Sequence, residues 1–373
     1  MNAFSPSGTR AVRTVPAQRA PGLRVNMVDP GSILPYYADS LSTALGLLGC
    51  EVTLATSHFK FGTPPEPGNY DRREVYYPLS AHLFRRSRAQ LPLKALEHPL
   101  GAVRVRRLPA DTLHVQWAAV PEIDRWLLPL DSSSVITAHD VLPRRTAHRI
   151  KLWRDVYQRF GAVIVHSQHG RDRLVTEVGV DRDRIEVIPH PAFFRQARYE
   201  DDGRTLLTFG VIRPYKQVEH SVAVAEEVGA RLLVLGDPTY ELGSVLAAPH
   251  VTWRLGFASE TALDDALARA TIAIFPYRQE LDQSGALMRC LGAGVPAVVY
   301  DVGSMAEPIL AYGAGAVVPA DDQAALGDAV RRLLSDPLAL RRARQGARRC
   351  AVERTWHACA TAHLALYQRL RHR

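Results

Sequence analysis

Short apolar runs that end in polar residues recur along the first half of the chain and predict an α/β fold. The first run covers 23–29, LRVNMVD, and a polar loop, PGSILPYY, follows it. In the next segment Leu41, Leu45 and Leu48 recur at the spacing of one helix face, and Gly49 suits the end of that helix. Because EVTLAT then resumes the apolar pattern, the opening predicts a strand–helix–strand unit and a parallel sheet.

Three more runs are typical of buried parallel strands, at 112–117, 134–140 and 162–167. In such sheets the functional groups gather at the carboxyl ends of the strands. The polar side chains at those predicted ends are Asp29, Gln116, His139, Asp140, His166 and Ser167.

The pattern restarts after a stretch rich in proline and charge, so two domains are expected. We predict a disordered tail at 1–22, an N-terminal Rossmann-like domain at 23–190, a linker at 191–204 and a second Rossmann-like domain at 205–355. The last segment, 356–373, is expected to be a helix that crosses back to the first domain. A cleft between two facing domains is the natural ligand site.

The net charge of +8 is concentrated in two arginine-rich segments, 85–107 and 331–354. Solvated surface explains both segments, while the first also suits contact with an anionic membrane surface or an anionic acceptor. Since no zinc finger, aromatic RNA-binding box or recognition helix accompanies the charge, nucleic acid is not an expected partner. No apolar run has the length of a membrane helix, and the four cysteines show no metal spacing, so we expect reduced thiols and a cytoplasmic location.

Residues 284–308, SGALMRCLGAGVPAVVYDVGSMAEP, predict an anion site at the start of a helix. The Ser284 hydroxyl suits a helix cap, and Gly285 leaves room for a ligand to approach the backbone. Free amides and the helix dipole at this end favour a diphosphate. Leu287, Cys290, Leu291 and Gly294 recur at the spacing of one buried helix face. Arg289 lies about 200° around the helix from Leu287, so it points away from this face and shares a face with Gly285.

The segment FGVIRPYKQVE, 209–219, adds two cations beside another helix start. A strand ends at Gly210, and Arg213 and Lys216 follow on the loop. Fixed cations at that place neutralise a diphosphate leaving group, although a lysine at a helix start is often only surface charge.

Taken in order, ITAHDVLP, VHSQHGRDRL, IEVIPHP, FGVIRPYKQVE and QSGALMRCLGAGVPAVVYDVGSMAE resemble the GT-B glycosyltransferases of the retaining family 4 type, also called group 1. The resemblance covers about 23–370 and is strongest at 205–310. It implies an acceptor on the N-terminal domain, a nucleoside-diphosphate sugar on the C-terminal domain, and no cofactor or metal ion.

Carried over by position, the resemblance implies three groups of site residues. His139 and Asp140 stand near the transferred sugar and the acceptor hydroxyl. The acceptor is further expected at Gly31, Ser32 and Gln116. The donor residues are Gly210, Arg213, Lys216, Ser284, Gly285, Arg289 and Glu307.

Two departures from the family pattern concern the nucleoside end. The family's paired glutamates fall here at Leu281 and Arg289, with Glu280 and Asp282 as possible replacements for the first, and only Gly31 is left of a Gly–Gly loop. Because a guanidinium accepts no hydrogen bond, Arg289 is expected to reach phosphate or to stack near the base.

The function indicated is sugar transfer from a nucleoside-diphosphate sugar to a glycan, lipid-linked or natural-product acceptor. Two alternatives stay open, a catalytically degenerate scaffold protein and another enzyme of the same architecture, such as a sugar-nucleotide epimerase or a phosphorylase. A dehydrogenase is disfavoured, because no G-x-G-x-x-G follows the first strand.

Overall fold

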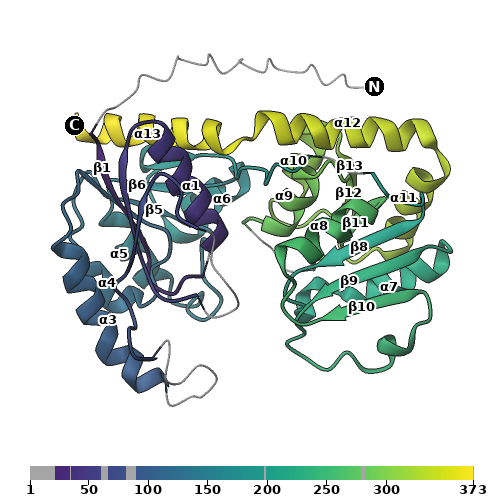
Figure 1. Ribbon diagram of the computed structural model, residues 1–373, viewed down its shortest axis with the longest axis horizontal. Helices are drawn as coiled ribbons and strands as arrows, with labels where there is room; N and C mark the ends of the chain where they lie inside the picture. The colour runs from purple at the N-terminus through teal and green to yellow at the C-terminus, as the bar shows by residue number, and fades with distance from the viewer. Residues whose placement is uncertain are drawn as a thin grey trace.

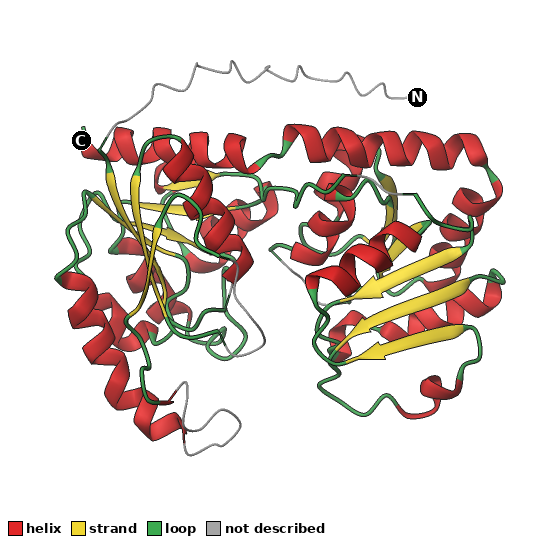
Figure 2. Ribbon diagram, in the orientation of Figure 1, coloured by secondary structure: helices red, strands yellow, loops and turns green. Residues whose placement is uncertain are grey.

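The computed structural model describes residues 22–33, 35–59, 66–80, 90–196, 199–278 and 282–372. Two α/β units lie side by side, and two long helices in succession run along one edge of both units (Figure 1). Figure 2 shows the strands of each unit as one sheet surrounded by helices. The expected pair of Rossmann-like domains is confirmed.

The N-terminal sheet has seven parallel strands in the order β3-β2-β1-β4-β5-β6-β7. A reversal of strand order beside β1 is typical of doubly wound sheets, and ligands bind at the carboxyl ends of the strands there. The strands are β1 (Arg24–Asp29), β2 (Glu51–Thr56), β3 (Asp71–Glu74), β4 (Thr112–Val115), β5 (Val135–Thr137), β6 (Ala162–Val165) and β7 (Ile185–Val187).

The C-terminal sheet repeats this arrangement with six parallel strands in the order β10-β9-β8-β11-β12-β13. Alternate residues of its strands face two separate cores; for example, Leu207 and Leu206 of the first strand belong to different clusters. The strands are β8 (Thr205–Phe209), β9 (Arg231–Gly236), β10 (Val251–Leu255), β11 (Ile272–Phe275), β12 (Ala297–Tyr300) and β13 (Gly315–Val318).

Helices cover both sheets. The N-terminal domain has α1 (Pro35–Leu47), α3 (Gln90–Arg106), α4 (Pro121–Leu127), α5 (Ile150–Gln158) and α6 (Gln168–Arg173), which continues as a π-helical turn, Leu174–Val178. After the linker come α7 (Val218–Glu227), α8 (Glu260–Arg269), α9 (Gly285–Gly292), α10 (Ala306–Tyr312), α11 (Gln323–Ser335), α12 (Pro337–Glu353) and α13 (Trp356–Arg371). Short 3-10 turns lie at Arg182–Arg184, Pro214–Lys216 and Gly243–Ala247. In the described residues no helix is both long and apolar enough to span a bilayer.

The C-terminal helix α13 belongs to the core of the N-terminal domain. Leu364, Leu366 and Tyr367 are buried in the same cluster as the residues of β1 and α1. The Tyr367 hydroxyl also lies 2.6 Å from Nδ1 of His114 on β4. The successive helices α12 and α13 therefore join the two domains along one edge of the molecule (Figure 1).

The structure differs from the predicted elements mainly at strand ends and sheet edges. The runs at 112–117, 134–140 and 162–167 form strands of three or four residues, because their terminal polar residues belong to the loops that follow. The edge strand β3, DRRE, was not predicted, since it lies at the border of the sheet and shows no apolar pattern. Most of the predicted tail lies outside the described residues.

Candidate active site

Gly210 and Lys216 lie together at the carboxyl end of β8. Gly210 has a φ of +95°, and a Cβ atom there would lie 3.0 Å from Nζ of Lys216. Burial, aided by the positive charges of Arg213 and Arg144, lowers the pKa of Lys216 to about 7. A bound anion would favour the protonated amine and raise this pKa again, so the loop is suited to a phosphate group.

The predicted helix start at Ser284 is confirmed. The Ser284 hydroxyl accepts a hydrogen bond from the Leu287 amide at 3.3 Å, and α9 begins at Gly285. A Cβ atom on Gly285 would meet nothing within 4 Å, so the space before this helix is open.

Tyr277 connects these two halves of the candidate donor site and was not singled out from the sequence. Its ring centre lies 5.2 Å from Nζ of Lys216. Burial raises the pKa of its phenol. Its ring lies in the same buried cluster as Leu287 and Met288, so the tyrosine that follows β11 packs between the cation and α9.

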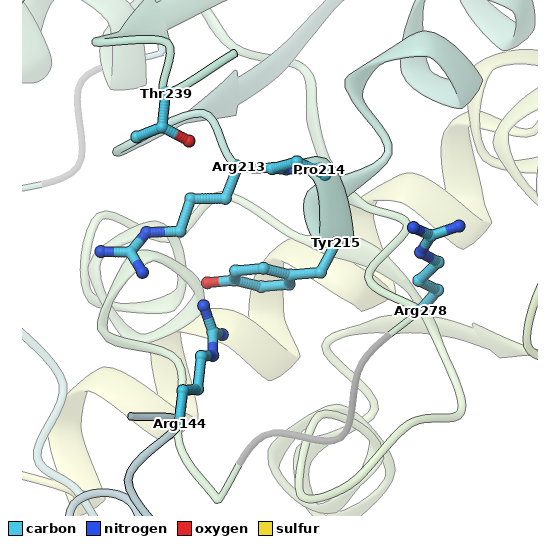
Figure 3. A pocket seen from close by; sticks show the side chains of 6 residues that line it. All are labelled: Arg144, Arg213, Pro214, Tyr215, Thr239 and Arg278. Atoms are coloured by element: carbon cyan, nitrogen blue, oxygen red, sulfur yellow. The ribbon is translucent and has the colours of Figure 1, made fainter. Parts of the chain in front are cut away.

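Arg213 lines a cavity of about 570 Å³ with Arg144, Pro214, Tyr215, Thr239 and Arg278 (Figure 3). The Arg144 guanidinium carbon lies 4.0 Å from the ring centre of Tyr215. In Figure 3 the guanidinium groups of Arg144 and Arg213 approach each other near the Tyr215 hydroxyl, while Arg278 points away on the far side of the ring. Arg144 comes from the N-terminal domain, so both domains contribute to this cavity.

Arg289 is engaged by protein groups. Its guanidinium forms a 2.7 Å ion pair with Glu260, at the start of α8, and lies over the rings of Phe193 and Tyr36. Glu260 therefore places a carboxylate next to the position at which the family glutamate is missing. This pairing could not be found by spacing, because the partners are 29 residues apart.

His139 is held on both ring nitrogens. Its Nε2 lies 3.0 Å from Oε1 of Gln116, and its Nδ1 lies 3.2 Å from Nε2 of His166. The other nitrogen of His166 donates to the Ile188 carbonyl at 2.8 Å. Burial lowers the pKa of His139 well below its usual value, with a further contribution from His166. The ring is thus a neutral, fixed group at the end of β5.

Asp140 follows His139 and lies near the cations of the cavity. Burial and the neighbouring Asp282 raise the pKa of its carboxyl group, while Arg144 and Arg213 oppose this rise. Asp140 is therefore exposed to the charges of Asp282 and of both arginines.

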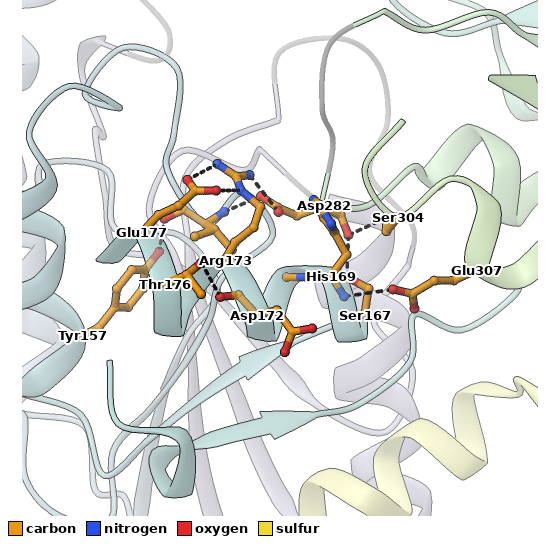
Figure 4. Close-up of polar contacts among 12 residues, drawn as sticks. Tyr157, Ser167, His169, Asp172, Arg173, Thr176, Glu177, Asp282, Ser304 and Glu307 are labelled. Carbon is orange, nitrogen blue, oxygen red and sulfur yellow. Dashed lines mark hydrogen bonds and ion pairs between the residues drawn. The ribbon is translucent and has the colours of Figure 1, made fainter. Parts of the chain in front are cut away.

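Asp282 links the two domains just ahead of the α9 cap. Its carboxylate accepts a 2.7 Å hydrogen bond from the Val141 amide and forms a 3.0 Å ion pair with Arg173 (Figure 4). Its carbonyl accepts the Ser304 hydroxyl at 2.8 Å. This carboxylate is thus committed to a domain contact rather than aimed at a sugar. The other proposed replacement, Glu280, and Leu281 itself lie outside the described residues.

Glu307 makes a second contact between the domains. Its carboxylate accepts hydrogen bonds from the amides of Gln168, at 3.3 Å, and His169, at 2.9 Å, at the N-terminus of α6 (Figure 4). The residue expected beside the nucleotide therefore caps a helix of the opposite domain in this arrangement.

Of the remaining acceptor residues, only Gln116 is brought to His139. Gly31 and Ser32 form the turn after β1, where the Ser32 amide donates to the Asp29 carbonyl at 3.2 Å. Ser32 lines a small depression with Thr56 and Phe59 at the end of β2. Among the described residues, no three His, Cys, Asp or Glu side chains are grouped as a metal ion would require.

Comparison with protein families assigns both domains. Residues 35–192 match the model described as Glycosyltransferase Family 4, and residues 203–336 match that of Glycosyl transferases group 1. The two matches leave out residues 1–34, residues 193–202 and residues 337–373, which include α12 and α13. The chain belongs to the group 1, family 4 type of glycosyltransferases.

Individual proteins and solved structures are similar to this chain at sequence identities below 30%. An exopolysaccharide phosphotransferase of Streptomyces coelicolor is 26% identical over 66% of this chain, which spans only 30% of that protein's length. A D-inositol 3-phosphate glycosyltransferase of Catenulispora acidiphila is 26% identical over 83% of this chain and 75% of its own. The solved structure of sucrose-phosphate synthase from Thermosynechococcus elongatus, 17% identical, shares the fold with a TM-score of 0.75 over 93% of this chain and 99% of that one.

Proposed function

We propose that this glycosyltransferase transfers a sugar from a nucleoside-diphosphate sugar to an acceptor hydroxyl, with retention of anomeric configuration. The observation that carries the proposal is the group formed by Gly210, Arg213 and Lys216, connected through Tyr277 to the open start of α9 at Ser284. A glycine turn, two cations and a helix start together suit a diphosphate.

The chemistry then rests on positioning and charge. Arg213 and Lys216 neutralise the diphosphate as the bond between the anomeric carbon and the phosphate oxygen breaks. The acceptor oxygen bonds to the same face of that carbon, and its proton passes to the departing phosphate oxygen. His139, Gln116 and Asp140 position the sugar and the acceptor from the opposite domain, and the proposal includes no metal ion and no protein nucleophile.

A panel of UDP, GDP, ADP and TDP tests the donor site by thermal shift. We expect one of them to raise Tm at millimolar concentration, and Lys216→Met to abolish the rise, while Lys151→Gln, a change at an exposed cation on α5, leaves it intact. Release of the same nucleotide from its sugar conjugates then identifies the donor, and EDTA should leave the rate unchanged. If no nucleotide stabilises the protein, the scaffold alternative is favoured, as the occupation of Arg289 and Glu307 by protein contacts already suggests.

We further propose that the acceptor is presented at an anionic membrane surface, on the cytoplasmic side. On α3, Leu96, Leu100 and Val103 form an exposed stripe at helical spacing, with Leu96 72% exposed. Arg104 and Arg106 lie on the same helix, so an apolar stripe is flanked by positive charge. Residues 85–89 of the basic segment lie outside the described residues.

Co-sedimentation with phosphatidylglycerol vesicles at low salt tests this surface. The double change Leu96→Glu with Leu100→Glu should release the protein from the vesicles, whereas Leu338→Glu, at a leucine 58% exposed on α12, should not. Equal binding to phosphatidylcholine vesicles, or none to either, would contradict the proposal.

A further inference from the structure

The cavity lined by Arg144, Arg213, Tyr215 and Thr239 lies to one side of the other candidate diphosphate residues. Its lining includes Arg213 but none of Gly210, Lys216, Ser284 and Gly285. A volume of about 570 Å³ is in the range of small-molecule sites. The space therefore extends from the diphosphate position toward the acceptor domain.

Positive charge prevails in this cavity, because three arginines line it, and Asp140 is the carboxyl group whose pKa responds to Arg144 and Arg213. Among the described residues, no ion pair is formed by Arg144, Arg213 or Arg278, in contrast to Arg173 and Arg289, which are paired. The effect of Arg144 and Arg213 on the pKa of Lys216 shows that their charges act together on one place. An anion is the ligand that relieves this repulsion.

The geometry of Arg144 suits an oxyanion. Its guanidinium stacks on the ring of Tyr215, with the carbon 4.0 Å from the ring centre. Stacking occupies the face of the group and leaves its N–H edge free to donate, which is the arrangement that recognises phosphate. In Figure 3 the Tyr215 hydroxyl and the guanidinium of Arg213 lie beside this group.

The position of Arg144 in the chain indicates that the bound anion is a group of the acceptor. Arg144 lies on the loop that follows β5 and carries His139, Asp140 and Val141, on the domain expected to bind the acceptor. The Val141 amide is held by Asp282 of the other domain, so this loop is fixed against the donor side.

We propose that the Arg144–Arg213–Tyr215 cavity is a second oxyanion subsite that binds a phosphate group carried by the acceptor, beside the donor diphosphate. The inference rests on the proposed function, since it presumes that the diphosphate occupies the Lys216 side. The subsite is complete only when both domains contribute, so it selects phosphorylated acceptors when the domains lie as they do in this structure.

Calorimetric titration of inorganic phosphate into protein saturated with the stabilising nucleoside diphosphate tests the subsite. We expect one phosphate to bind, Arg144→Gln to weaken it at least tenfold and Tyr215→Phe to weaken it less. Arg145→Gln, at a neighbouring arginine that donates to the Ala119 carbonyl, is the matched control and should have no effect.

The nucleotide titration separates this inference from the proposed function. If the nucleotide binds but the saturated protein takes up no phosphate, the subsite is refuted and the donor site stands. If Arg144→Gln weakens the nucleotide tenfold instead, Arg144 serves the donor diphosphate and the inference is wrong. If no nucleotide binds, the proposed function fails; phosphate uptake by the free protein that is sensitive to Arg144→Gln then still supports an oxyanion site.

Discussion

A methyl group added at Gly285, the first residue of α9, is expected to affect ligand binding without affecting folding. An added Cβ atom meets nothing within 4 Å, and alanine has the higher helix propensity. We therefore expect Gly285→Ala to keep or slightly raise Tm, while nucleotide affinity falls about tenfold because the phosphate approaches this backbone. Gly292→Ala is the contrasting control, since its Cβ would lie 2.2 Å from the Phe193 carbonyl and should destabilise the fold without a ligand. Unchanged nucleotide affinity in Gly285→Ala would place the phosphate elsewhere.

The lowered pKa of Lys216 predicts that donor binding depends on pH. In the free protein its pKa is lowered to about 7 by burial and by Arg213 and Arg144, and a bound diphosphate raises it. Affinity is therefore constant below pH 7 and falls as pH rises above 7, by up to about tenfold per unit. Calorimetry from pH 6 to 9 measures the slope. In Lys216→Met the slope should vanish, and a slope of the same size in that variant would assign the titration to another group.

At the scale of elements, the Arg289–Glu260 pair joins α9 to the start of α8. The Arg289 side chain is only 13% exposed, so restoring the family residue by Arg289→Glu would set two carboxylates against each other. We expect a loss of roughly 2 kcal/mol in the free energy of unfolding, most of which Arg289→Glu combined with Glu260→Gln recovers. Urea unfolding of the single and double variants measures both values. Equal stability of wild type and Arg289→Glu would show that the pair is dispensable.

What the sequence predicts well is local. The cap at Ser284 and the burial of Leu287, Cys290 and Leu291 depend on positions within one helix, and the structure confirms them. The recurring apolar runs likewise predict most of the strands, because strands that are buried on both faces consist mainly of apolar residues. The edge strand β3 escapes, since its exposed residues carry no such constraint.

Contacts that depend on domain docking cannot be predicted from the same patterns. Arg144 and Tyr215 stack although they are far apart in the chain, and Glu307 meets α6 across 138 residues. Periodicity reports which face of an element is buried, not which other element covers it. The candidate diphosphate residues were therefore within reach of sequence reasoning, whereas the second subsite and the domain contacts were not.

At the scale of the whole molecule, two carboxylates of the C-terminal domain hold backbone amides of the N-terminal domain. Asp282 accepts from Val141, and Glu307 accepts from Gln168 and His169 (Figure 4). Removing the second carboxylate with Glu307→Ala leaves two amides at the start of α6 without their acceptor. We expect a larger radius of gyration in solution scattering, because arrangements in which the domains lie further apart are then more populated. Glu227→Ala, at a surface glutamate paired with Arg331 inside one domain, should leave the radius unchanged. An unchanged radius in Glu307→Ala would show that α12 and α13 alone set the domain arrangement.

The histidines buried in the N-terminal domain make the stability of the protein sensitive to acid. His114, His139, His166, His190 and His363 are all nearly inaccessible to solvent. Burial lowers the pKa of His166 and of His363 to about 4, and it lowers the other three well below the usual value. The unfolded chain binds protons near pH 6.5, so the folded state binds fewer protons between pH 6.5 and 4. Stability is therefore full above pH 6.5 and is lost as pH falls, by about 3 kcal/mol at pH 4 for each histidine with a pKa near 4.

Urea unfolding between pH 7 and 4 measures this loss, and His363 is the residue to vary. Its Nδ1 donates to the Cys359 carbonyl of its own helix, and it makes no contact with the candidate donor residues. In His363→Leu the free energy of unfolding at pH 7 changes only through the lost packing and hydrogen bond. Its slope against pH, from pH 6.5 toward 4, decreases because one proton fewer is taken up on unfolding. Nucleotide binding at pH 7 should not change. If His363→Leu follows the wild-type decline at every pH, His363 is not one of the groups that titrate on unfolding, and the acid sensitivity is carried by the other four of these histidines.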